Sequence, residues 1–152
     1  RVQIENLEIE KKFSKEIQRP SKYELKLIGT VLHWAEGNKR QPYRVQFANS
    51  DPNIVRIYLR FLREILQVRD EKFLVSIRIH PNINPSRAIK FWAEVTKLPK
   101  EQFHFVRQIS IASQRKRPFN SLPHGTLDVR FHGRPKFFQI KGWIDGIIRQ
   151  AN

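Results

Sequence analysis

The sequence contains no cysteine and no methionine, and it has only 14 acidic residues. Without cysteine the chain forms no disulfide bonds and no thiolate metal sites, which is compatible with a reducing compartment such as the prokaryotic cytoplasm. No apolar run approaches the ~20 residues of a transmembrane helix, so no membrane partner is expected. No signal-peptide pattern opens the chain. Because the first residue is not methionine, we expect a fragment or a processed product. The sequence leaves open whether a further N-terminal domain precedes it.

Basic residues are abundant, in contrast. The chain has 29 Lys and Arg side chains and a formal net charge of +15. Almost all of this excess lies in residues 21–152, which we expect to form one domain, whereas residues 1–20 form an N-terminal arm or linker. A basic excess of this size favours a polyanionic partner, most often nucleic acid. Ribosome-type RNA association and simple solubility are the alternatives.

Several helix-start signals divide the domain. Residues 1–19 are charged, with sparse apolar positions, and indicate a helical or extended arm that ends at Pro20. Ser21 and Glu24 match the S-x-x-E capping box, and Gly37 is a natural stop for the helix that follows. Asparagine or aspartate followed by proline opens two more helices, to about residues 66 and 97. A last helix is predicted from about Pro135.

The segments between these helices alternate between apolar and polar residues, which predicts strands at 43–49, 73–81, about 105–113 and 126–132. We therefore expect an α+β fold with an antiparallel sheet, helices on its apolar face and an open basic face. The open face would carry Arg44, Gln46, Ser76, Arg78, His80, Arg130 and His132. Such a sheet can enter a major groove and contact base edges. The alternative is an ordinary solvated face.

Common catalytic motifs are absent from the sequence. It has no G-x-x-x-x-G-K-[ST] or G-x-G-x-x-G phosphate loop, no H-E-x-x-H pair and no G-x-S-x-G elbow. The five histidines stand at no metal-ligand spacing. The basic run Arg115, Lys116 and Arg117 is a candidate phosphate contact or nuclear signal, although a tripeptide of this kind is also typical of a solvated loop.

Acidic residues in this basic chain are informative because they are few. Asp51 is expected to cap a helix, and Asp128 is expected to be a cross-strand partner close to Arg130. Glu36 has no evident local role, since a carboxylate at a helix C-terminus is unfavourable. It is either a surface acid paired with Lys39 or Arg40, or a functional group.

The segment LIGTVLHWAEGNK resembles the signature helix of LAGLIDADG homing endonucleases. Residues 29–37 fall on the nine motif positions, with Glu36 at the acidic one. The order of elements is similar to the α-β-β-α-β-β-α core of that family, with a first strand compressed into residues 38–42 or absent, and with residues 84–103 as an addition. The pattern W-A-E-G-N-K…F-x-N-S-D-P…P-x-G-T resembles, more narrowly, a group of prokaryotic LAGLIDADG-like proteins.

The resemblance implies a homodimer on double-stranded DNA, since the chain has one motif. Its helices would pair through Gly29, Leu32 and Ala35, and Glu36 would bind Mg²⁺ near a scissile phosphate. Lys39 would polarise the attacking water, and Arg40 would contact phosphate. The resemblance equally allows a DNA-binding regulator without cleavage, and the charge alone allows an RNA-binding protein.

Overall fold

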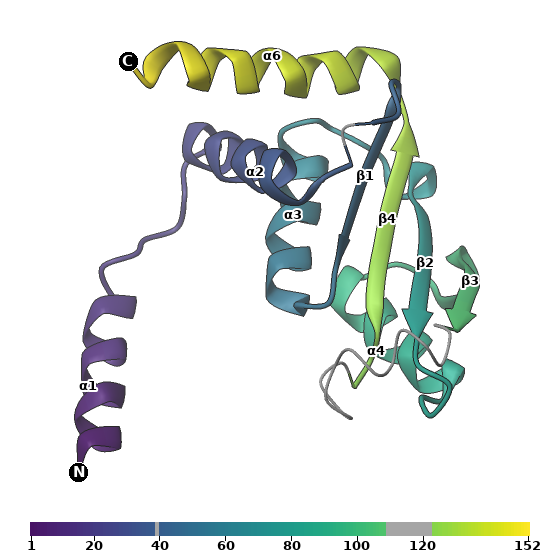
Figure 1. Cartoon of the computed structure of the whole chain (residues 1–152), viewed down its shortest axis with the longest axis horizontal. Helices are drawn as coiled ribbons and strands as arrows, with labels where there is room; N and C mark the ends of the chain where they lie inside the picture. Colours follow the sequence, from purple (N-terminus) through teal and green to yellow (C-terminus); the bar gives the residue numbers. More distant parts are fainter. Residues whose placement is uncertain (39, 109–122) are drawn as a thin grey trace.

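The computed structural model describes residues 1–38, 40–108 and 123–152, apart from the side chains of residues 104–108. Figure 1 shows a sheet with helices packed to one side and one helix apart at the N-terminal end. The helices are α1 (Val2–Ser14), α2 (Lys22–Glu36), α3 (Pro52–Glu64), α4 (Pro85–Thr96) and α6 (Arg134–Gln150), and the strands are β1 (Arg44–Asn49), β2 (Leu74–Ile79), β3 (Phe103–Gln108) and β4 (Thr126–His132).

The predicted helix starts are confirmed at atomic level. Ser21 Oγ accepts a hydrogen bond from the Glu24 N–H at 3.1 Å, and the Glu24 carboxylate accepts one from the Ser21 N–H at 3.1 Å. The Asp51 side chain caps α3, and the Asn84 side chain caps α4 by accepting from the Ser86 N–H at 2.8 Å. Each cap satisfies backbone donors that a helix leaves free at its first turn.

The sheet has the strand order β1-β4-β2-β3. Strand β4 pairs antiparallel with both β1 and β2, as predicted, but β3 pairs parallel with β2. The prediction of a wholly antiparallel sheet is therefore wrong for β3, which lies at one edge of the sheet. Helix α4 lies between β2 and β3 in the chain, and a crossover through a helix returns the chain in the same direction.

A short segment after α2 runs beside the outer edge of β1. Gly37 forms an isolated antiparallel bridge with Phe47, and the Asn38 N–H donates to the Gln46 carbonyl oxygen at 2.9 Å. The strand that the resemblance would place here is thus reduced to this single bridge. The contact brings the C-terminal end of α2 to the sheet.

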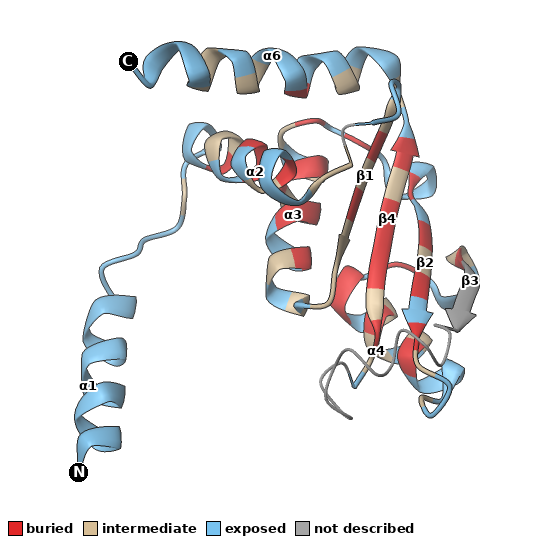
Figure 2. Cartoon of the chain, in the orientation of Figure 1, coloured by how far each residue is buried: buried red, intermediate tan, exposed pale blue. Residues whose placement is uncertain are grey.

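One face of the sheet forms the core with α3 and α4, as predicted, and Figure 2 shows the buried residues concentrated between these layers. The buried apolar residues of the strands are Val45, Phe47, Val75, Ile77, Ile79, Phe103, Leu127, Val129 and Phe131. Helix α2 packs on α3, and α6 lies across α2 and the end of β1. Within the described residues, no helix combines the length and apolar character needed to cross a bilayer.

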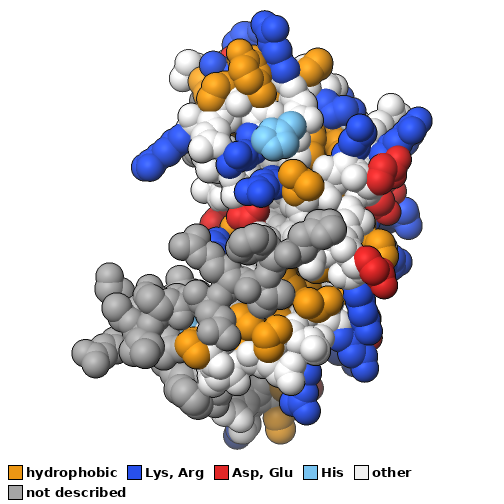
Figure 3. Space-filling view, turned by 90° about the vertical axis from the view of Figure 1, so that its right-hand side faces the viewer, with side chains coloured by type: hydrophobic (Ala, Val, Ile, Leu, Met, Phe, Trp, Pro, Cys, Tyr) orange, Lys and Arg blue, Asp and Glu red, His pale blue; other side chains and the backbone are white. Residues whose placement is uncertain are grey.

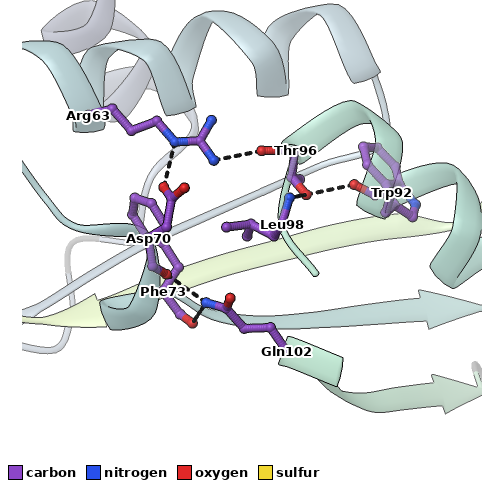
Figure 4. A network of polar contacts seen from close by, with 7 residues as sticks. All are labelled: Arg63, Asp70, Phe73, Trp92, Thr96, Leu98 and Gln102. Carbon is purple, nitrogen blue, oxygen red and sulfur yellow. Dashed lines mark hydrogen bonds and ion pairs between the residues drawn. The ribbon is translucent and has the colours of Figure 1, made fainter. Parts of the chain in front are cut away.

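Arg63 of α3 ties the helical layer to the start of β2 (Figure 4). Its Nε donates to Asp70 Oδ1 at 2.7 Å, and its Nη2 donates to the Thr96 carbonyl oxygen at 2.6 Å. Its guanidinium group also lies 5.9 Å from the centre of the Phe73 ring. One side chain therefore joins α3, the turn before β2 and the end of α4.

Candidate functional site

The alternating polar residues of β1, β4 and β2 lie on one face of the sheet, opposite the core. In the register, Arg44 lies opposite His132, Gln46 lies opposite Arg130, and Ser76 lies opposite Asp128. We call this surface the polar face and define it by Arg44, Gln46, Ser76, Arg78, Asp128, Arg130 and His132. The structure brings together six of the seven residues predicted to carry the open face, and Asp128 lies with them, on the same side of β4 as Arg130 and His132.

Arginine side chains on the polar face are not neutralised within the described part of the chain. Arg44 and Arg130 are half-buried and Arg78 is exposed. None of the three forms an ion pair with a described carboxylate, unlike Arg60 and Arg63 of α3. Figure 3, which views the molecule from the right-hand side of Figure 1, shows Lys and Arg side chains distributed over the described surface and fewer Asp and Glu side chains.

A chain of hydrogen bonds crosses the polar face from its edge to its centre. Asn38 Nδ2 lies 3.4 Å from Gln46 Oε1, and Gln46 Nε2 donates to Asp128 Oδ2 at 2.7 Å. The cross-strand role predicted for Asp128 is confirmed, and its partner is Gln46 on β1. A carboxylate only accepts hydrogen bonds, so Asp128 fixes which end of the Gln46 amide faces it.

Three buried polar atoms on or beside the polar face have no hydrogen-bond partner among the described residues. They are Arg44 Nε, Asp128 Oδ1 and His80 Nδ1, the last directly after β2. Buried polar atoms are nearly always satisfied, by protein, water or ligand. Two of these atoms belong to charged groups, one a donor and one an acceptor, and both lie on the same face of the sheet.

The C-terminal end of α2 presents Glu36 to solvent, as its last residue. Gly37 follows, and a Cβ atom there would lie 2.4 Å from the His33 carbonyl oxygen, so a side chain does not fit. His33 is buried, and its Nδ1 lies 2.9 Å from the hydroxyl oxygen of Tyr58. Burial raises the pKa of Tyr58, which keeps this hydroxyl protonated. The helix end that carries Glu36 is therefore linked to α3 through His33 and Tyr58.

The predicted catalytic and phosphate-binding residues are only partly placed. Arg40 is exposed next to Asn38, whose Oδ1 accepts from the Arg40 N–H at 2.9 Å. Lys39 and the basic run Arg115, Lys116 and Arg117 lie outside the described residues. Among the described residues, no group of three or more His, Cys, Asp or Glu side chains is arranged to hold a metal ion. Glu36 is thus a single carboxylate within one chain.

Gly29, which was predicted to be at a dimer interface, is buried inside the chain. A Cβ atom at Gly29 would lie 2.0 Å from Phe61 Cγ, so the missing side chain makes room for a ring of α3. The close neighbour that Gly29 admits therefore belongs to the same chain. Leu32 is half-buried and packs against the core. Ala35 is exposed.

The outward side of α2 is nevertheless apolar. Ile28 and Val31 are 40% and 47% exposed, and Trp34 and Ala35 extend the same side toward the end of the helix. We call these four residues the α2 stripe. Helices at protein surfaces usually carry polar residues there, so an apolar outward side is a candidate interaction surface. Ala35 is the only predicted interface residue on it.

Sequence reasoning missed Asn38 and the α2 stripe. The α2 stripe could have been predicted from the sequence of the helix, because residues 28, 31 and 35 are three and four positions apart. This spacing places them on one face, which differs from the buried face with Leu25 and Gly29. The role of Asn38 could not have been predicted in this way, since its contact with Gln46 depends on the isolated bridge after α2. No protein-family model matches the sequence, and comparison with curated proteins and with solved structures found no significant match.

Proposed function

We propose that the chain is a LAGLIDADG-like DNA-binding protein that contacts duplex DNA through the polar face. The observation that carries the proposal is the set of unneutralised arginines on a sheet face with unpartnered buried polar atoms, in a chain of net charge +15. Phosphates supply most of the affinity in such complexes, and side chains such as glutamine and arginine select bases in the major groove.

The arrangement of elements supports the LAGLIDADG-like part of the proposal. The order α2, β1, α3, β2, β4, α6 follows the family core once the α4–β3 addition is set aside and the first strand is reduced to the bridge at Gly37. The helix that carries Glu36 ends at the edge of the polar face, because the next residues contact Gln46. Glu36 would therefore lie beside bound DNA.

A binding assay tests the polar face directly. The probes are a labelled 30-base-pair duplex pool and a structured RNA hairpin, followed by fluorescence anisotropy over a range of salt concentrations. Replacing Arg44, Arg78 or Arg130 by alanine should weaken duplex binding, and each should lower the salt slope by about 0.9 if it contacts one phosphate. Arg60→Ala is the matched control, since Arg60 pairs with Glu64 on α3.

The outcomes separate the candidate partners. Neutral results for all three arginine variants would remove the polar face as the contact surface. Binding of the hairpin as tight as that of the duplex, or tighter, would support the RNA-binding alternative instead. Selection of a duplex sequence from a random library would favour specific recognition over general attraction to phosphates.

The α2 stripe supports a homodimer, with the stripes of two copies packed on each other. Val31 lies near its centre and is 47% exposed. A charge buried in such an interface is unfavourable, so Val31→Glu should convert the dimer to a monomer in sedimentation experiments. Ile57→Glu is the control, because Ile57 is comparably exposed on α3. A monomeric wild-type chain that stays monomeric on DNA would contradict the dimer.

Metal-dependent cleavage is the second candidate activity, and the exposed position of Glu36 beside the polar face favours it. Glu36 fits as one carboxylate ligand of Mg²⁺, and a dimer would supply the second Glu36. Bound Mg²⁺ would supply an activated water and charge neutralisation at phosphate. A plasmid-nicking assay with Mg²⁺ or EDTA, using wild type and Glu36→Gln, distinguishes a nuclease from a non-cleaving DNA-binding regulator.

A further inference from the structure

Helix α1 packs on nothing in the described structure. All 13 of its residues are exposed (Figure 2). Val2, Ile9 and Phe13 fall on one side of it, and Ile4 and Leu7 fall on the opposite side. An isolated helix of this length is marginally stable in water, because helix stability in proteins comes mainly from packing an apolar side. The side of α1 that carries Val2, Ile9 and Phe13 has no partner surface in the described structure.

A groove of matching character lies between the N-terminal half of α2 and the C-terminal half of α6. It has a volume of about 640 Å³, and Leu27, Trp143 and Ile147 are among the residues that line it. Thr30 also lines it, and the buried Thr30 Oγ1 has no hydrogen-bond partner among the described residues. This is an apolar groove with one unpartnered hydroxyl in its wall.

Two glycines keep the groove open. Gly142 and Gly146 lie one turn apart on α6 and line the groove, and a Cβ atom on either would meet no atom within 4 Å. Glycine inside a helix costs about 1 kcal/mol relative to alanine. Contacts within the described chain do not offset this loss of helix stability. Close packing of a second helix at these two positions would offset it.

We propose that α1 of the same chain docks in this groove, antiparallel to α2, with Ile9 and Phe13 over the two glycines of α6. Residues 15–21 connect α1 to α2, and Tyr23 and Lys26 in the first turns of α2 line the groove. A connection of this length is ordinary for two antiparallel helices. The 13 residues of α1 and the 15 of α2 span about 20 and 22 Å, so the helices match in length.

Tethering favours α1 of the same chain over other occupants. Glu5, Glu10 and Lys12 flank the side of α1 that carries Ile9 and Phe13, and Lys26 and Arg149 are the charged residues that line the groove. A segment tethered through a short connection acts at an effective concentration near the millimolar range, which exceeds that of a second copy. In Figure 1, α1 lies apart from α6, so docking requires a change at residues 15–21.

Disulfide cross-linking tests the proposal cleanly, because the native chain has no cysteine. The variant Phe13→Cys with Gly146→Cys should oxidise at least tenfold faster than Ile4→Cys with Gly146→Cys, since Ile4 lies on the opposite side of α1. The product should be a cross-linked monomer on a non-reducing gel. A cross-linked dimer would show that α1 of a second copy occupies the groove, and equal rates for the two pairs would show that α1 does not dock. Either result overturns the proposal.

Limited proteolysis gives a second readout that needs no new cysteine. Docking should protect Lys15, so Phe13→Asp should raise the rate of trypsin cleavage there severalfold while residues 21–152 stay intact. Ile4→Asp, on the opposite side of α1, should leave the rate near that of wild type. Equal rates for wild type and Phe13→Asp would overturn the proposal. Neither experiment uses DNA, so this docking and the proposed DNA binding fail or succeed independently.

Discussion

Gln46 Nε2 lies 2.7 Å from Asp128 Oδ2, and this hydrogen bond joins β1 to β4 at the centre of the polar face. The acid accepts at one oxygen and leaves the other, Oδ1, buried without a partner among the described residues. It therefore orients the Gln46 amide and places a negative charge among arginines. On a DNA-binding surface, such a charge opposes phosphate and favours a base that offers an amino group.

The first prediction concerns this acid. Asp128→Asn keeps the shape and removes the charge, so affinity for random duplex DNA should rise, by about fivefold if the removed repulsion is ~1 kcal/mol, as for charges 4 Å apart in water. Preference for a selected sequence should fall, as measured by competition in fluorescence anisotropy. Asp145→Asn makes the same charge change at an exposed position on α6. An equal rise for both variants would place Asp128 away from the DNA.

The second prediction concerns the contact of α2 with α3. Gly29→Ala puts a methyl group where Phe61 now lies, so it should destabilise the fold by about 1–3 kcal/mol in urea unfolding, as overpacking does. The double variant Gly29→Ala with Phe61→Leu should lose less unfolding free energy than the two single variants lose together, because the smaller leucine side chain at position 61 leaves room for the added methyl group. Additive effects would mean that the two residues do not compete for the same space.

The third prediction concerns the network in Figure 4. Arg63→Ala removes two hydrogen bonds and leaves the Thr96 carbonyl oxygen without this donor, so unfolding should become easier by about 1–3 kcal/mol. Arg60→Ala removes only an exposed pair with Glu64 and should cost at most about 0.5 kcal/mol. Thermal unfolding of the two variants side by side provides the comparison. Similar losses would show that the Arg63 network adds little.

The fourth prediction concerns the start of α2. Ser21→Ala removes the cap and should cost about 1 kcal/mol in urea unfolding. Hydrogen bonds from the Ser21 side chain and backbone lower the pKa of Glu24 below its ordinary value. The stabilisation of the fold by ionised Glu24 is therefore complete above the pKa that Glu24 has in the unfolded chain. It disappears as the pH falls through the lowered pKa of Glu24 in the folded chain. The stability difference between wild type and Glu24→Gln should shrink correspondingly between pH 6 and pH 2. A constant difference would contradict this coupling.

Local signals predicted most of the elements because each rests on neighbouring residues. The caps at Ser21, Asp51 and Asn84 and the alternation in 126–132 determine where helices and strands begin, whatever lies around them. The same alternation assigned residues such as Arg44 and Arg130 to one face of the sheet.

Relations between distant residues were not predictable in this way. The parallel pairing of β3 follows from the path of α4, and the burial of Gly29 depends on Phe61, which lies on another helix. Glycine in a helix indicates a close neighbour without saying which chain provides it. The hydrogen bond between Gln46 and Asp128 likewise joins residues 82 positions apart, so no local pattern identifies it.

The central position of β4 has a consequence for how the chain folds. Strands β1 and β2 do not pair with each other, since β4 lies between them, and β4 is the last strand to be synthesised. Until residue 132 leaves the ribosome, the apolar sides of β1, β2 and the helices over them have no completed sheet to pack against. Closing such long loops slows folding and exposes apolar surface to aggregation. We therefore expect sheet formation to be a late folding event that depends on chaperones more than the local helices do.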